Sequence, residues 1–418
     1  MQLPALPPSR RALLLMLGAG ALTACGGGRL STGPAVTSTD YRPVDNPAFD
    51  AWLAGFRGRA AAAGISAATL DSALGRAGFL PDVIERDRNQ AEVDRSLQDY
   101  LALTVDDARV TTGREMLRRH AGVLAEIEAR FGVEKQVVVA IWGVESRFGA
   151  RMGDIPVISA LATLAFDGRR GQFFEQQLVA ALRILQNGDI TVDRMTGSWA
   201  GAMGHTQFIP TSYEAYAVDF RGDGRRDIWS EDPTDGLAST GSYLANAGWQ
   251  RGRPWGLEVS LPSGFNAGQA GRGRNRSVSE WTAQGVRLAG GGTIPDHGPA
   301  SVILPSGTTG PAFVIFRNFG AIARYNNSEK YVIAVGHLSD RIAGGGPLRG
   351  SFPPDAQGLT LADRQELQRR LTAAGYDAGT PDGVVGSGTR DAIRAYEAAM
   401  GLPVTGEATL AILQRLRG

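Results

Sequence analysis

The sequence contains few of the residues on which metal, nucleotide and nucleic-acid chemistry depend. Its 4 histidines lack HExxH spacing, and 1 cysteine forms no cluster, which argues against a zinc hydrolase. Lysine occurs only at Lys135 and Lys330, neither after a phosphate-binding glycine loop, and no GxSxG motif is present. A formal net charge of +1 is not the basic excess that nucleic-acid binding normally leaves. Zinc, nucleotide and α/β-hydrolase chemistry lose support, and no nucleic-acid partner is expected.

The length and composition are those of an ordinary globular protein. The chain of 418 residues, 43% hydrophobic and 20% charged, can bury large cores and predicts two or three domains. Helical spacing of apolar residues begins near Phe49 and returns around residues 66–76 and 114–131. Residues 157–166 and 173–185 predict two more core helices, so the first half is expected to be mainly helical.

Residues 1–25 have the three parts of an export signal. Arg10 and Arg11 precede an apolar run over residues 12–22 that is too short to span a bilayer comfortably, and small residues then lead to Cys25. Residues 22–25 resemble the bacterial lipobox, in which the signal is cut before a cysteine that is then lipidated. The alternative is a secretory signal with an incidental cysteine, although a lone exported thiol invites oxidation. We predict a lipid anchor at Cys25 and leave the Sec and twin-arginine routes open.

The residues after Cys25 predict a tether. Gly, Ser, Thr and Pro dominate residues 26–47, which is the composition of a flexible segment. Gly26, in place of aspartate, suggests by the same lipobox resemblance sorting to the outer membrane. The expected location is the periplasm, with the protein anchored to the inner face of the outer membrane.

A carboxylate closes an apolar helix predicted from about residue 133. Ile141, Trp142 and Glu145 share helical spacing, and Gly149 is expected to stop the helix. Half-burial against apolar walls disfavours a charged carboxylate, so the pKa of Glu145 is expected to rise towards the range useful to a general acid. Most glutamates near helix ends are solvated or cap a backbone group, so this segment alone does not establish catalysis.

Residues 197–213 offer polar groups beside aromatic residues, a combination suited to binding a sugar. The segment is rich in small residues that allow close backbone approach, and Gln207 offers an amide, although such a stretch is more often tight helix packing.

The secondary structure is expected to change further along the chain. Residues 250–310 are rich in Gly, Pro and Arg and carry short alternating runs, which predict a small β-rich lobe. The basic run at residues 272–276 is taken as a solvated loop. Helical spacing resumes over residues 328–342.

Four of these segments occur in an order that resembles one family. They are residues 143–149 (GVESRFG), 160–166, 197–213 and 324–326, and over residues 50–343 they are similar to the membrane-bound lytic murein transglycosylase B family. The resemblance implies a mainly α (α+β) protein with a lysozyme-like helical catalytic domain over residues 48–343. The small β-rich lobe would be an insertion in that domain.

The resemblance also implies a reaction and a set of site residues. In that family the glutamate of the G-V-E motif is the sole catalytic acid and base, which maps onto Glu145. Ser198, Gln207, Tyr243 and Tyr325 map to substrate contacts, while core packing with a bonded hydroxyl is almost equally expected for the two tyrosines. The implied enzyme is a peptidoglycan lytic transglycosylase. It would cleave the β-1,4 bond between N-acetylmuramic acid and N-acetylglucosamine in glycan strands and leave 1,6-anhydromuramic ends.

After a linker predicted at residues 344–357, residues 358–418 predict a separate three-helix unit. Residues 386–389 and 406–409 each place a turn and a threonine before an apolar helix face, and the leucines of residues 361–371 supply a third helix. Residues 382–386 with Thr389 resemble the peptidoglycan-binding domain found on cell-wall enzymes. The alternative is a small helical bundle with an unrelated function.

One acidic loop is weighed as a metal site. Asp219, Asp223 and Asp227 stand at the first, fifth and ninth places of a calcium loop, with glycine at the sixth. Arg221 occupies a ligand place, and Ser230 stands where a bidentate glutamate is needed. We therefore predict no metal and no other cofactor, with these acids paired to arginines.

Two other functions stay open. A hydrolytic muramidase on the same fold would complete the reaction with water. Ordinary glycosidases pair two carboxylates, and the sequence does not rule out a second catalytic carboxylate besides Glu145. An inactive peptidoglycan-binding scaffold lipoprotein is the non-enzymatic alternative. Chain-end preference, peptide-stem requirement and protein partners are not encoded in any motif we find.

Overall fold

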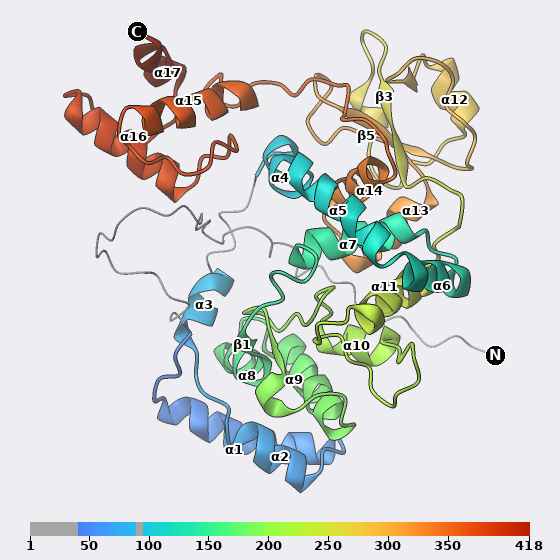
Figure 1. The fold of residues 1–418 in the computed structure, drawn as a ribbon, viewed down its shortest axis with the longest axis vertical. Coiled ribbons are helices and arrows are strands. Elements are labelled where there is room, and N and C mark those ends of the chain that lie inside the picture. The colour runs from blue at the N-terminus through green and yellow to red at the C-terminus, as the bar shows by residue number, and fades with distance from the viewer. Residues whose placement is uncertain (1–40, 89–94) are drawn as a thin grey trace.

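The computed structural model describes residues 41–88 and 95–418 of the chain. The predicted signal, Cys25 and most of the predicted tether therefore lie outside the described residues. Within them the chain is mainly helical with a few short strands, which confirms the predicted fold class (Figure 1). None of the helices described is both long enough and apolar enough to cross a membrane.

Helices form most of the body. Those before the sheet are α1 (Pro47–Ala62), α2 (Ala67–Leu74), α3 (Pro81–Arg88), α4 (Leu97–Thr104), α5 (Asp107–Arg119), α6 (Ala121–Phe131), α7 (Lys135–Ser146), α8 (Val157–Asp167), α9 (Gly171–Gln186), α10 (Pro210–Tyr216) and α11 (Thr234–Asn246). The two-residue strands β1 (Ile155–Pro156) and β2 (Thr196–Gly197) pair antiparallel beside them. Helices α8 and α9 confirm the two predicted at residues 157–166 and 173–185.

Four of the helices described are buried along most of their length. They are α7, α8, α11 and α14 (Glu329–Ile342), and in α7 every residue from Val137 to Ser146 is buried. A helix that is apolar or small on all sides belongs in a core rather than on a surface. Helix α7 packs against α5, α11 and α14, while α13 (Arg317–Tyr325) packs on α14. The end of α7 is thereby enclosed by other helices.

The β-rich lobe is a four-stranded antiparallel sheet with its own core. Its strands are β3 (Gly256–Ser260), β4 (Arg287–Leu288), β5 (Ser301–Ile303) and β6 (Ala312–Ile315), in the order β4-β3-β6-β5. Strand β6 lies just beyond the predicted lobe of residues 250–310. Trp281, on the short helix α12 (Val278–Ala283), is fully buried in the lobe's hydrophobic cluster. Trp255 packs against Gly336 of α14, where a Cβ would lie 2.2 Å from the indole, so the lobe is seated closely on the helical body.

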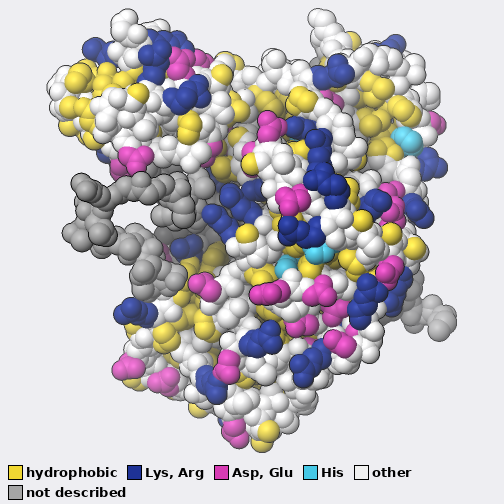
Figure 2. Space-filling model, in the orientation of Figure 1, with side chains coloured by type: hydrophobic (Ala, Val, Ile, Leu, Met, Phe, Trp, Pro, Cys, Tyr) yellow, Lys and Arg dark blue, Asp and Glu magenta, His cyan; other side chains and the backbone are white. Residues whose placement is uncertain are grey.

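The last three helices form a separate unit around a third core. They are α15 (Leu361–Ala373), α16 (Ser387–Ala399) and α17 (Leu410–Arg417), and they lie apart from the helical body in Figure 1. Arg364 of α15 nonetheless pairs with Asp99 of α4 at 2.5 Å and with Asp355 at 2.8 Å. Large hydrophobic side chains are exposed on this unit at Met400 and Val404, and Figure 2 shows hydrophobic atoms gathered there.

Candidate active site

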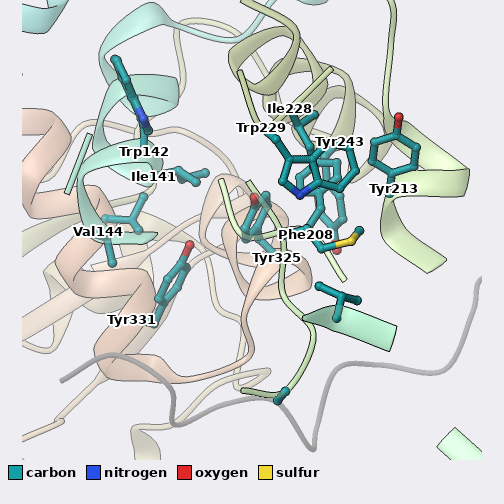
Figure 3. Close-up of a cluster of buried hydrophobic side chains, with 14 of the residues drawn as sticks. Ile141, Trp142, Val144, Phe208, Tyr213, Ile228, Trp229, Tyr243, Tyr325 and Tyr331 are labelled. Atoms are coloured by element: carbon teal, nitrogen blue, oxygen red, sulfur yellow. The ribbon is translucent and has the colours of Figure 1, made fainter. Parts of the chain in front are cut away.

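The carboxyl group of Glu145 lies in the core at the end of α7. The residue is only 9% exposed. The hydroxyl of Tyr331, on α14, donates a hydrogen bond of 2.7 Å to Oε1 of Glu145. Figure 3 shows the Tyr331 ring pointing towards the end of α7 beside Val144. Burial and the partial negative charge of a helix C-terminus both favour the protonated carboxyl, whereas the hydroxyl donor favours the carboxylate.

The charge of Glu145 raises the pKa of two tyrosine hydroxyls. Burial raises the pKa of Tyr331 well above its usual value, and the charge of Glu145 raises it further. Burial likewise raises the pKa of Tyr100, on α4, with a second contribution from Glu145, while Arg109 acts in the opposite direction. Both phenols therefore stay protonated near neutral pH and are able to donate hydrogen bonds.

The chain reverses immediately after Glu145 through two strained residues. Helix α7 ends at Ser146, and Arg147 and Phe148 adopt left-handed conformations with φ of 51° and 59°. The expectation that Gly149 stops the helix was therefore wrong by two residues. Within the described residues, Gln207 is the one other non-glycine residue with positive φ, at 53°. Such conformations cost about 1–3 kcal/mol per residue and cluster at functional sites, so their position in these two segments supports the candidate site.

His205 ties the end of α7 to the loop of residues 197–209. Trp142 Nε1 donates to His205 Nδ1 at 3.1 Å, so Nδ1 is the acceptor and Nε2 carries the proton. That Nε2 lies 2.8 Å from the carbonyl oxygen of Ser230. Burial lowers the pKa of His205, which keeps the ring neutral. The hydroxyl of Ser146 donates to the carbonyl of His205 at 2.6 Å, which fixes the residue next to Glu145.

Gln207 and Ser198 make contacts that shape the same loop. The Gln207 amide nitrogen donates to the carbonyl of Met152 at 2.8 Å and to that of Gly204 at 2.9 Å. The Ser198 hydroxyl accepts a bond from the backbone nitrogen of Ala202 at 3.1 Å. Both predicted contact residues are half-buried and hold turns around the site, and their role towards substrate stays a prediction.

The two predicted tyrosines lie in an aromatic cluster that leads to Glu145. Tyr243 donates to the carbonyl of Arg324 at 2.5 Å, and the Tyr325 hydroxyl donates to the carbonyl of Thr206. Their ring centroids lie 4.8 Å apart, and the Tyr325 ring is parallel to that of Tyr331 at 6.5 Å (Figure 3). The structure thus brings both near the candidate acid while engaging both hydroxyls with backbone, as the packing alternative expects.

Sequence reasoning missed Tyr331, Tyr100 and His205. Tyr331 stands in the predicted helix of residues 328–342, and Tyr100 belongs to a short helix with no motif. No local signal separates either from an ordinary core tyrosine. His205 lies inside the 197–213 segment, where a lone histidine among small residues was the available signal.

The acidic loop is held by its own backbone. Asp219 accepts bonds from the backbone nitrogens of Gly222, Asp223 and Gly224, and Asp227 accepts from those of Trp229 and Ser230. The expected pairing of these acids with arginines was wrong, because the arginines pair elsewhere: Arg221 with Glu126 and Arg226 with Asp189. The donors that satisfy these carboxylates are peptide groups, and the metal-free reading stays a prediction.

Comparisons with known proteins identify two families along the chain. Residues 48–340 match the family described as Transglycosylase SLT domain. Residues 360–416 match the family described as Putative peptidoglycan binding domain. These ranges resemble the predicted domains of residues 48–343 and 358–418.

Individual relatives agree with both matches. The chain is 36% identical over 220 residues to membrane-bound lytic murein transglycosylase B of Escherichia coli (strain K12), covering 51% of this chain and 58% of that protein. The crystal structure of SltB3 from Pseudomonas aeruginosa in complex with NAG-NAM-pentapeptide is 48% identical, with a TM-score of 0.72, and covers 89% of this chain and 100% of that one. The Escherichia coli lytic transglycosylase Slt35 in complex with calcium is 29% identical, with a TM-score of 0.61, over 72% and 93% of the two chains. The enclosed glutamate, the fold around it and these matches together place the chain in the Transglycosylase SLT domain family.

Proposed function

We propose that the protein is a lytic transglycosylase that cleaves the β-1,4 bond between N-acetylmuramic acid and N-acetylglucosamine in peptidoglycan. The observation that carries the proposal is the position of Glu145, buried at the end of α7 with a hydroxyl donor at 2.7 Å. Two relatives, membrane-bound lytic murein transglycosylase B and SltB3 in complex with NAG-NAM-pentapeptide, support the same substrate.

Glu145 would act first as acid and then as base. The protonated carboxyl gives its proton to the oxygen of the leaving N-acetylglucosamine, while the substrate's acetamido oxygen stabilises the developing cation. The resulting carboxylate then removes the proton from the muramic C6 hydroxyl, whose oxygen attacks the anomeric carbon. The product is a 1,6-anhydro ring, formed without addition of water.

Glu145 acts without a partner carboxylate in the proposed mechanism, as the family resemblance implies. Glycosidases that use two carboxylates place them within about 5–10 Å of each other across the bond. Glu145, buried and bonded to the hydroxyl of Tyr331 at 2.7 Å, would carry the one proton that passes to the leaving sugar and is replaced from the substrate's own hydroxyl.

Replacement of the acid tests this proposal. Glu145→Gln keeps the shape of the side chain and removes its proton transfer, so release of anhydromuropeptides from purified sacculi is expected to stop while binding to sacculi continues. Glu231→Gln is the matched control, because Glu231 is an exposed glutamate outside this cluster. Full activity of Glu145→Gln would overturn the assignment.

The mass of the products separates the alternatives. A hydrolytic muramidase gives products heavier by one water than the anhydro products, and an inactive scaffold gives none. Mass spectrometry of one digestion of sacculi therefore distinguishes all three functions.

The C-terminal unit is proposed to hold the enzyme on the wall. Its own hydrophobic core and its family match support a separate binding module, and its exposed Met400 and Val404 offer apolar surface. Deletion of residues 358–418 is expected to weaken retention on sacculi more than turnover of soluble glycan. Unchanged retention would count against the binding role.

The anchor and location are proposed from the sequence alone. Cys25→Ala is expected to move the protein from the outer-membrane fraction to the soluble periplasmic fraction, because one lipidated cysteine carries the anchor. Membrane association that survives this change would contradict lipidation at Cys25.

Calcium is proposed to be unnecessary, so chelation should leave the melting temperature of the protein unchanged.

A further inference from the structure

His205 is bonded through both ring nitrogens to segments that lie far apart in the sequence. Its Nδ1 accepts from Trp142, which stands on α7 one turn before Glu145, and its Nε2 donates to the carbonyl of Ser230. The residue is only 4% exposed. A buried ring held at both nitrogens has one orientation, so a shift of either partner moves the ring and changes its contact with the other.

The backbone of His205 makes the same connection a second time. Its nitrogen donates to the carbonyl of Ile228 at 3.0 Å, and its carbonyl accepts from the hydroxyl of Ser146 at 2.6 Å. A Cβ on Gly149 would lie 2.8 Å from Nδ1, so the turn after α7 packs directly on the imidazole. Glu145 directly precedes Ser146, so these contacts hold the end of α7 on which the acid stands.

The acidic loop of residues 219–230 supplies both carbonyls that meet the histidine, those of Ile228 and Ser230. One oxygen of Asp227 accepts from the backbone nitrogens of Trp229 at 2.9 Å and of Ser230 at 3.0 Å. A carboxylate that accepts from nitrogens two and three residues ahead fixes the local turn, and with it the directions of the carbonyls. The side chain of Asp227 therefore sets the place where the loop contacts the histidine.

We propose that the acidic loop positions Glu145 through His205, which makes Asp227 and His205 positioning residues for the reaction. Asp227 fixes the turn of the loop, the loop carbonyls hold the imidazole, and the imidazole holds the end of α7. The exact placement of the acid matters because a displacement of about 1 Å between reacting groups costs up to about a hundredfold in rate. The inference rests on the proposed function and gives the acidic loop a part in it.

A double-mutant cycle tests this link. His205→Asn keeps an amide oxygen near the place of Nδ1, which can accept from Trp142, but its side chain is too short to reach Ser230. Asp227→Ala releases the turn that presents the Ser230 carbonyl. Each change is expected to lower kcat on soluble glycan about tenfold and to change KM by less than about twofold, since the acid is displaced while sugar contacts remain.

The double variant separates a shared link from two independent defects. Its kcat should be no lower than that of the more impaired single variant, because the same connection is already broken. A product of the two losses, about a hundredfold, would overturn the proposal. A wild-type kcat in folded His205→Asn would also overturn it, since a purely structural role lowers the melting temperature and leaves kcat per folded enzyme unchanged.

Two controls stand within the acidic loop. Asp227→Asn keeps an oxygen that can accept from the two nitrogens, so it should recover most of the kcat lost in Asp227→Ala. Asp223→Ala removes an exposed carboxylate that accepts from the Arg225 backbone nitrogen at 2.9 Å, and it should keep the wild-type kcat. Circular dichroism establishes that each variant is folded. If Asp227→Ala does not fold, the kcat of His205→Asn decides the test alone.

The outcomes also distinguish this inference from the proposed function. Wild-type enzyme that forms no anhydro products would overturn the proposed function, and the positioning role with it. Wild-type enzyme that forms them as fast as His205→Asn does would overturn the positioning role and leave the reaction in place.

Discussion

The hydroxyl of Tyr331 donates a hydrogen bond of 2.7 Å to Oε1 of Glu145, across 186 residues of sequence. A hydroxyl donor stabilises the charged carboxylate more than the protonated acid. Tyr331 therefore helps to set the pH at which Glu145 loses the proton that the first step of the reaction requires.

Tyr331→Phe is expected to move the alkaline limb of the kcat profile to higher pH by about one unit, the equivalent of one hydrogen bond to a charged group. The sign follows because loss of the donor leaves the carboxylate less stable, so the acid holds its proton to a higher pH. Kinetics on soluble glycan between about pH 5 and 9, roughly two units either side of neutral, measure the shift. Tyr213→Phe is the control, since it removes a buried hydroxyl bond to the carbonyl of Arg226 away from Glu145. An unmoved profile in Tyr331→Phe would contradict this role.

Gly204→Ala is expected to lower the free energy of unfolding by about 3 kcal/mol. Gly204 has φ of 68°, and a Cβ there would lie 2.3 Å from the carbonyl oxygen of Ile228, to which the neighbouring His205 nitrogen donates. Gly222→Ala is matched, because Gly222 has φ of 76° with open space around it, and it should cost only about 1 kcal/mol. Urea denaturation compares the two, and equal costs would show that the contact with Ile228 is unimportant.

Asp99→Asn is expected to loosen the contact between the C-terminal unit and α4. Asp99 pairs with Arg364 at 2.5 Å, and the Arg364 side chain is only 4% exposed, so the pair is better shielded from water than a surface ion pair. Small-angle scattering should show a larger radius of gyration for the variant. Asp71→Asn, which breaks the exposed pair with Arg57, should leave the radius unchanged. An unchanged radius in Asp99→Asn would mean that other contacts hold the two parts together.

His337 is expected to make the protein less stable as the pH falls from about 6.5 to about 4. Burial, with a smaller contribution from Arg341, lowers the pKa of His337 from 6.5 to about 4. Between these values the unfolded chain binds a proton that the folded chain does not, so stability rises with pH and is lost on acidification, by about 3 kcal/mol in all. His337→Asn should flatten this part of the pH dependence in urea denaturation. A slope identical to that of the wild type would contradict the prediction.

The sequence predicted the fold well where the signal was local. The apolar spacing around Glu145 identified α7, and the turn-and-threonine pattern identified the last two helices. That pattern proved less regular than it looked. Thr409 caps α17, whereas Thr389 lies within α16 and donates from its buried side chain to the carbonyl of Ala378.

The rest of the site was not predictable from local pattern. Tyr331 meets Glu145 only because α14 packs on α7, and the tautomer of His205 depends on Trp142, which is 63 residues away. The stop after Ser146 was misplaced because propensity assigns left-handed turns to glycine, while here tertiary packing holds Arg147 and Phe148 in that conformation. Whether Glu145 has a raised pKa stays a prediction.

The reversal after α7 makes two positions of the GVESRFG segment depend on each other. Phe148 folds back so that a Cβ on Gly143 would lie 2.6 Å from its ring, while the same ring stands edge-on to Trp142 at 5.7 Å. An alanine at position 143 would therefore displace the ring and with it the turn beside Glu145. Variants at these two positions should be tolerated in pairs, with a larger residue at 143 rescued by a smaller one at 148, so the space available for one side chain is set by the other.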